Sequence, residues 1–168
     1  MATDASPTAP LEHPHDRPDE TPAERADRNF VELLQELRVA QTGVQILFAF
    51  LLTLPFTNRW TTITDPEQVV YLCTLIAAAS ASALLIAPVA LHRITFQRGV
   101  KHVVVHTSDK LALAGLCCLV LAVVGAVFLI VDVVAGGQLA GILAALVAAL
   151  FSTLWFVLPM ALVPGRRR

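Results

Sequence analysis

The sequence predicts an all-α integral membrane protein, a four-transmembrane-helix bundle whose first helix has an amphipathic cytoplasmic extension. Hydrophobic residues make up 56% of the 168 residues and charged residues only 15%, against roughly 45–50% and about 25% in ordinary globular chains. The charges are also segregated, because Asp132 alone lies within an apolar run. One run, from Arg28 to Phe56, begins amphipathic and charged and ends almost wholly apolar. This run predicts a helix that starts in water and enters lipid.

Four apolar stretches are long enough to span a membrane, because a hydrocarbon core of ~30 Å is crossed by about 20 helical residues. We expect the spans at residues 39–57, 69–91, 111–135 and 139–163. Residues 26–165 would then form the membrane domain, followed by a basic end at residues 166–168. Residues 1–25 are rich in proline and acidic side chains, so we expect a disordered cytoplasmic tail. No signal peptide is expected there.

The basic residues predict the orientation of the spans. Eleven of the twelve lie in the N-terminal segment, in the link between the second and third spans, or at the C-terminus, and Arg59 is the exception. By the positive-inside rule, both termini are cytoplasmic. We therefore expect a multi-pass protein of the bacterial cytoplasmic (inner) membrane, surrounded by the lipid bilayer and with no nucleic-acid partner.

Small residues at i, i+4 spacing predict close helix packing, because small side chains let helix backbones approach in lipid. The link at residues 136–138 is so short that the third and fourth spans should form an antiparallel hairpin. We also expect the small faces to support a homo-oligomer. These faces comprise Gly137, Gly141, Ala145, Ala149 and Thr153 in the fourth span, and Ala114, Cys118, Ala122 and Ala126 in the third.

A polar stripe crosses the junction between the charged and apolar halves of the first run. An amide side chain such as Gln45, roughly 10 Å deeper than Arg38 at 1.5 Å per residue, needs a hydrogen-bonding partner. The stripe is therefore a candidate for packing against other helices or a second copy, or for the entrance of a ligand or ion. Its members are Gln35, Arg38, Gln41, Thr42 and Gln45.

Asp132 is the candidate intramembrane charge, and such residues are functional candidates by default. It lies 22 residues after Lys110, or about 33 Å along a helix, which places it at the outer interface. There it can pair with Arg59, the candidate outer partner. A proton-carrying role for Asp132 is the alternative.

The cytoplasmic link between the second and third spans contains candidate metal ligands. His102 and His106 are spaced i, i+4, with Asp109 following, so a helix there could present metal ligands. Two histidines without a firm third ligand favour instead a basic link that faces lipid headgroups. We predict no metal and no cofactor. Catalytic motifs are also missing, so we predict no enzyme.

The segment RNFVELLQELRVAQTGVQILFAFLLTLPF, together with APVALHR at residues 87–93, resembles a family of small four-span membrane proteins from actinobacteria. The family is a domain of unknown function whose members sometimes carry the label sodium:proton antiporter. The resemblance covers about residues 28–160 and implies the four-span fold. Known antiporters bind ions through carboxylates near mid-membrane on broken helices, and this chain has neither.

The function best supported by the sequence is a structural or regulatory membrane component that self-associates. The alternative is a small, antiporter-like cation or proton transporter that uses the polar stripe and Asp132, as a single chain or as an oligomer. A third hypothesis is a cytoplasmic-face sensor of metal or lipid that uses His102 and His106. The sequence identifies no small-molecule or ion substrate.

Overall fold

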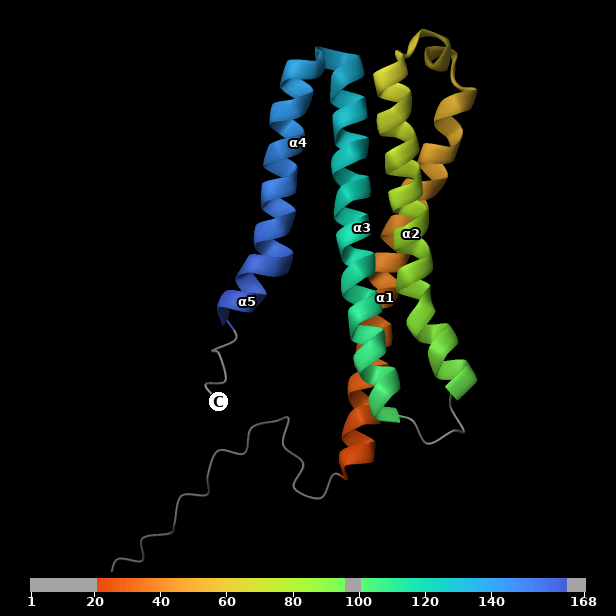
Figure 1. Ribbon diagram of the computed structural model, residues 1–168, viewed down its shortest axis with the longest axis vertical. Coiled ribbons are helices and arrows are strands. Elements are labelled where there is room, and N and C mark those ends of the chain that lie inside the picture. The colour runs from red at the N-terminus through yellow and green to blue at the C-terminus, as the bar shows by residue number, and fades with distance from the viewer. Residues whose placement is uncertain (1–20, 96–100, 163–168) are drawn as a thin grey trace, which may run out of the picture.

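The computed structural model describes residues 21–95 and 101–162, and all of its regular elements there are helices (Figure 1). Four of these helices are long and apolar enough to cross a membrane, which confirms the four apolar helices predicted from the sequence. The candidate spans run over Phe30–Phe56, Asp65–Leu91, Thr107–Ala135 and Gly137–Leu162. The helices run alternately up and down, so α1 begins and α5 ends at the same end of the molecule.

Helix α1 (Pro22–Thr53) is a continuous helix of 32 residues, about 48 Å long at 1.5 Å per residue. It begins inside the segment expected as a tail because Thr21 and Glu24 form a capping box and proline is favoured at the first helical position. Pro55, which has no backbone N–H, follows the last α-helical turn, and the chain continues as the 3₁₀ helix η1 (Leu54–Phe56). The predicted extension of the first span is therefore helical.

Helices α1, α2 (Asp65–Thr95) and α3 (Lys101–Ala135) share a heptad pattern of buried residues. In α1 the buried positions recur every seven residues, and each is no more than 4% exposed. In α2 they alternate at spacings of three and four, and α3 follows the same spacing apart from the additional buried Val120. Such a 3.5-residue repeat is typical of left-handed coiled-coil packing. The positions are Phe30, Leu37, Val44 and Leu51 in α1, then Tyr71, Thr74, Ala78, Ala81, Leu85 and Pro88 in α2, and Ser108, Ala112, Gly115, Leu119, Ala122 and Ala126 in α3.

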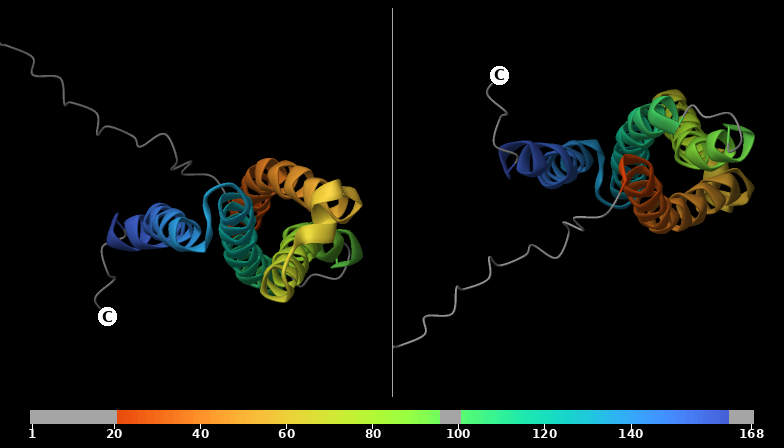
Figure 2. Two further views of the ribbon diagram at one scale, coloured as in Figure 1. Left: turned by 90° about the horizontal axis from the view of Figure 1, so that it is seen from above. Right: turned by 90° about the horizontal axis from the view of Figure 1, so that it is seen from below.

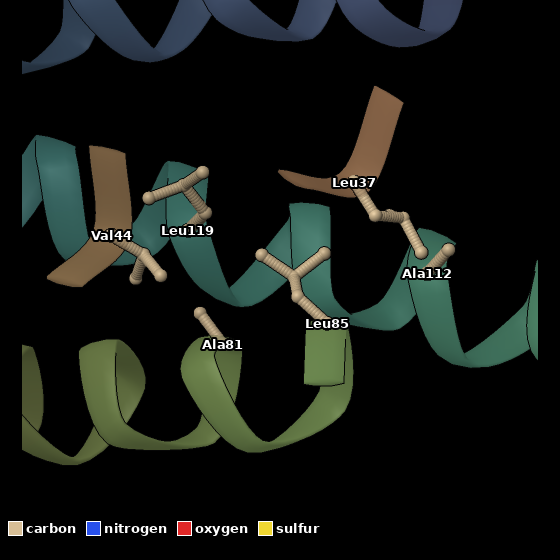
Figure 3. Packing of buried hydrophobic residues seen from close by; sticks show 6 residues of the cluster. All are labelled: Leu37, Val44, Ala81, Leu85, Ala112 and Leu119. Carbon is tan, nitrogen blue, oxygen red and sulfur yellow. The ribbon is translucent and has the colours of Figure 1, made fainter. Parts of the chain in front are cut away.

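The core of these three helices consists of two stacked clusters. Figure 3 shows the first cluster, in which Leu85 of α2 lies between side chains of α1 and α3. The second cluster surrounds Leu51 and Tyr71 near the other end of α1. The clusters comprise Leu37, Val44, Ala81, Leu85, Ala112 and Leu119, then Leu51, Tyr71, Ala78 and Ala122.

Two glycines of α3 allow it to approach α2 closely. A Cβ added at Gly115 would lie 2.9 Å from the Leu85 side chain, and one added at Gly125 would overlap the Thr74 hydroxyl. The Thr74 hydroxyl donates to the Val70 carbonyl at 2.7 Å, so this buried polar group is satisfied within α2. The close approach therefore costs no unsatisfied hydrogen bond at Thr74.

Helix α4 (Gly137–Ser152) departs from the expected four-helix bundle, because among the long helices it contacts α3 alone in the described part of the chain. Figure 2 shows it on the outer side of α3, away from α1 and α2. Gly136, with φ of 89°, makes the turn that returns α4 alongside α3, as the predicted hairpin requires. The short turn keeps α4 next to α3, and α4 lies on the side of α3 that faces away from α1 and α2. The observed arrangement is a three-helix core with one attached helix.

The end of the fourth span is bent by Pro159. This proline follows a π-helical turn, η3 (Thr153–Val157), and lies in the short helix α5 (Leu158–Leu162). The Leu158 N–H donates to the Thr153 carbonyl, one residue further back than in an α-helix. The wider turn is a known local adjustment around a proline, and it accounts for the bend between α4 and α5 in Figure 1.

Candidate functional site

The polar stripe on α1 is divided by the structure. Gln41 is half-buried, and its Nε2 donates to the Leu85 carbonyl of α2 at 2.7 Å. Gln35, Arg38 and Gln45 are exposed. Thr42 is exposed as well, and its hydroxyl donates to the Arg38 carbonyl at 3.0 Å. Gln41 is therefore the stripe residue that contacts a neighbouring helix, and the other four stripe residues are exposed on the outside of the three-helix core.

The acceptor of the Gln41 amide lies at a proline-modified turn of α2. Pro88 is fully buried, lacks the N–H that the Leu84 carbonyl would accept, and crowds that carbonyl with its ring. The neighbouring Leu85 carbonyl receives the Gln41 amide from α1. The last turns of α2 diverge from α3 beyond this point (Figures 1 and 2). Gln41 is thus explained as a packing residue at the bend.

Gln45 has no comparable partner within residues 21–95 and 101–162. Its side chain is exposed and lies within an apolar candidate span. Gly43 is close to it, and a Cβ added there would meet no atom within 4 Å. An amide group in this position gains most from a donor and acceptor supplied by another molecule.

Asp132 and Arg59 lie at the same end of the fold, as the span lengths predicted. The Arg59 Nη2 donates to the Val133 carbonyl at 3.3 Å, so Arg59 reaches the residue next to Asp132. The Asp132 carboxylate is half-buried and faces the α3–α4 turn, since a Cβ added at Gly137 would lie 3.2 Å from its Oδ1. Pairing of the two charges stays a prediction.

A pocket of about 190 Å³ lies beside Arg59, lined by residues of the 3₁₀ helix η2 (Asn58–Thr62) and of the neighbouring ends of α2 and α3. Tyr71 is buried in its wall, and its hydroxyl donates to the Leu51 carbonyl at 3.0 Å. The Trp60 ring meets the Tyr71 ring edge-on, with centroids 4.7 Å apart. We call this the η2 pocket; its lining is Leu54, Thr57, Arg59, Trp60, Ile63, Glu67, Tyr71, Leu129, Ile130, Val133 and Val134.

The sequence pattern alone does not predict the η2 pocket. The aromatic residues at this end are also what an interfacial belt contains, and Glu67 follows the pattern of a helix-capping residue. The pocket requires η2 to fold across the bundle end, and no pattern in residues 57–64 specifies that path. The one sequence signal was Arg59, the single basic residue between the first two spans.

The candidate metal ligands lie at the opposite end of α3. His102 and His106 are on one helix and one turn apart, as the metal hypothesis requires, although their side chains lie outside the described part. Asp109 is exposed. The described side chains contain no cluster of three or more histidine, cysteine or acidic residues. A metal site here stays a hypothesis.

The three cysteines are free. Cys73 and Cys117 are exposed and Cys118 is half-buried. All three lie within apolar candidate spans, where a cysteine behaves as a small hydrophobic residue.

Residues 19–159 match a family of unknown function, DUF6328, and this match covers most of the chain. The chain belongs to the DUF6328 family. The matched residues include all four candidate spans except the last few residues of the fourth. No curated protein and no solved structure matches the chain. The DUF6328 assignment therefore brings no known activity to the polar stripe or to the η2 pocket.

Proposed function

We propose that this DUF6328 protein is a structural or regulatory component of a membrane and that it acts as a homo-oligomer. The main observation that supports this proposal is that α4 contacts α3 alone among the long helices described. A helix with one neighbour keeps most of its surface for lipid or for another chain. A second copy of the chain is the occupant that we propose.

The surface chemistry of α4 supports a second copy as this occupant. Ala140 and Ala144 are buried, whereas the small face predicted for helix packing is exposed along its whole length. A Cβ added at Gly141 would meet no atom within 4 Å. An exposed small face allows close backbone approach between helices in lipid, which is the usual basis of their association. The exposed positions are Gly137, Gly141, Ala145, Ala149 and Thr153.

An apolar groove beside α4 offers further contact area. It has a volume of about 430 Å³ and is lined by α2, α3 and Ala144 of α4. Cys73 and Phe128 are among its lining residues. A helix from a second copy that packs on α4 could cover this groove as well, because it lies alongside α4.

The orientation that we propose has both termini in the cytoplasm. In the described part of the chain, Arg25 and Arg28 lie near the start of α1, Arg93 near the end of α2 and Lys101 at the start of α3, all at one end of the fold, whereas Arg59 lies at the other end. This asymmetry supports a cytoplasmic location for that end.

The alternative function is a small cation or proton transporter. One observation favours an oligomeric form of it, since Gln35, Arg38 and Gln45 are exposed outside the three-helix core. These side chains could line a polar path only if another chain covered them. Both functions therefore depend on self-association, and flux measurements distinguish them. Proteoliposomes that carry pH-sensitive and sodium-sensitive dyes should show no flux under the structural proposal, whereas flux abolished by Asp132→Asn would replace it with transport.

Self-association is tested with Gly141→Ile in the full chain. The added side chain meets open space in the single chain, so the fold should be kept while the small face is blocked. We expect the dissociation constant measured in detergent to rise at least about tenfold. Ala83→Ile, at an exposed position of α2, is the matched control and should leave association unchanged. A wild-type protein that is monomeric at all concentrations would overturn the proposal.

A further inference from the structure

The η2 pocket is the feature of the described chain that neither the packing of the helices nor the proposed self-association uses. Its lining is apolar apart from Arg59 and Glu67, the side chains in it that carry charge at neutral pH. Arg59 is exposed and Glu67 half-buried, so we place both at the mouth of the pocket. The volume of about 190 Å³ is below the roughly 300–1,000 Å³ of sites that enclose a drug-sized ligand. The pocket therefore fits a part of one hydrocarbon chain and not a whole large ligand.

The position of the pocket also points to a lipid. It lies at the ends of two candidate spans, which begin at Asp65 in α2 and end at Ala135 in α3. Lipid headgroups lie at that level of a bilayer, and tryptophan and tyrosine are enriched there. Trp60 and Tyr71 contribute such rings to the pocket wall.

The two charged side chains at the mouth have hydrogen-bonding groups that are not used within the described part of the chain. Arg59 makes one hydrogen bond to the Val133 carbonyl in the described part of the chain, and a guanidinium carries five N–H donors. Glu67 accepts from the backbone N–H and hydroxyl of Thr64 at 2.6 and 2.7 Å, both at Oε2. Its Oε1 remains for a donor outside the cap. With one positive and one negative side chain, the mouth has no net charge.

We propose that the η2 pocket binds a zwitterionic phospholipid that carries a primary ammonium group. Part of one acyl chain occupies the apolar interior, the phosphate contacts Arg59, and the ammonium contacts Glu67. A mouth with one positive and one negative group matches a headgroup with one of each sign, and charge-assisted hydrogen bonds form at both. An anionic headgroup would leave Glu67 without a partner. The proposal does not depend on self-association.

The occupancy of the pocket is tested by photo-crosslinking on the full chain in nanodiscs. The probe is phosphatidylethanolamine with a diazirine on its acyl chain, in a matrix of equal phosphatidylethanolamine and phosphatidylglycerol. We expect labelling to concentrate on peptides from residues 54–71 and 129–134. Val133→Trp, which fills the pocket from a partly exposed position, should lower this labelling at least about fivefold. Ile76→Trp, at an exposed α2 position outside the lining, is the matched control and should not.

Folding of each variant is checked by circular dichroism and gel filtration, and Ile130→Trp replaces Val133→Trp if the latter does not fold. Ile130 is exposed and lines the same pocket. Even labelling over all four spans, or unchanged labelling in the folded pocket-filling variant, would overturn the proposal.

The headgroup assignment is tested by exchanging the probe. A phosphatidylglycerol probe of the same acyl structure should label the wild-type pocket several-fold less. Glu67→Gln should narrow this difference, because glutamine keeps the helix cap but not the charge. Arg59→Gln should weaken labelling by both probes, since both contain the phosphate. Equal labelling of the wild-type chain by the two probes would contradict the assignment of the headgroup.

Discussion

Gln41 of α1 donates its side-chain amide to the Leu85 carbonyl of α2 at 2.7 Å, three residues before the buried Pro88. This bond joins two helices at the place where proline has modified the hydrogen bonding of one of them. It gives a polar residue inside a candidate span a specific structural role.

Gln41→Leu should therefore destabilise the fold. Hydrogen bonds between membrane helices average about 0.6 kcal/mol, with a maximum near 1.7 kcal/mol, and we expect a loss of free energy of unfolding within that range. The measurement is a denaturant titration of the detergent-solubilised chain followed by circular dichroism. Gln45→Leu is the control, because Gln45 is exposed and has no hydrogen bond within the described residues. Equal losses in both variants would contradict the role assigned to Gln41.

Gly125→Ala should be costly because its new methyl group would overlap the Thr74 hydroxyl. Overpacking of this kind typically costs about 1–3 kcal/mol. Gly43→Ala adds the same methyl group in open space, so it should be neutral or stabilising by up to about 1 kcal/mol. The free energies of unfolding of the two variants are compared in the same detergent.

Thr74→Ala should recover part of the Gly125→Ala loss, because it removes the overlapping hydroxyl and leaves the Cβ at 3.1 Å. A double-mutant cycle measures this coupling. Strictly additive losses would show that the two residues do not meet.

The first turn of α1 should loosen in acid. The N–H and hydroxyl of Thr21 donate to Glu24 Oε2 at 2.9 and 2.8 Å, and these bonds hold the pKa of Glu24 below its ordinary value. A lowered folded-state pKa means that the charged cap stabilises the helix above the unfolded-state pKa. This contribution is lost as the pH falls through the lowered pKa.

Amide hydrogen exchange in the first turn of α1, corrected for its intrinsic pH dependence, measures this loss. Exchange should accelerate as the pH is lowered in the wild type. In Glu24→Gln, where no charge titrates at this position, the same pH change should have much less effect. Identical pH profiles in the two proteins would contradict the assignment.

The orientation is tested by cysteine labelling. After Cys73, Cys117 and Cys118 are replaced by alanine, Thr64→Cys and Val100→Cys are introduced one at a time. A membrane-impermeant maleimide applied to whole cells should label the first and not the second, because the proposed orientation puts them on opposite sides. Labelling of both positions from one side would overturn the orientation.

Much of the fold follows from hydrophobic run lengths, because a helix that crosses lipid must satisfy its own backbone. The placement of Arg59 near Val133, beside Asp132, likewise follows from counting residues along two spans. Helix rotation does not follow in this way. Gln41 and Gln45 belong to one predicted stripe, yet one contacts α2 and the other is exposed, because the heptad seam through Leu37 and Val44 sets the rotation of α1.

The place of α4 could not be predicted from its own sequence. Its small residues suit several neighbours, and the choice depends on which neighbour the Gly136 turn allows it to reach. The η2 pocket could not be predicted either, because it depends on the path of residues 57–64, which have no periodic pattern. The sequence shows that a basic residue, Arg59, lies in this segment, but it does not show which residues surround it.

The contact of Thr74 with Gly125 limits how this protein can change shape. If α3 moved by one helical turn along α2, about 5.4 Å, Leu121 or Leu129 would replace Gly125 opposite Thr74, and neither has room there. The Thr74–Gly125 contact thus prevents α2 and α3 from sliding past one another by a helical turn. A change of shape by a one-turn slide between α2 and α3 is therefore excluded, whereas α4 contacts α3 alone among the long helices described and is held by fewer neighbours.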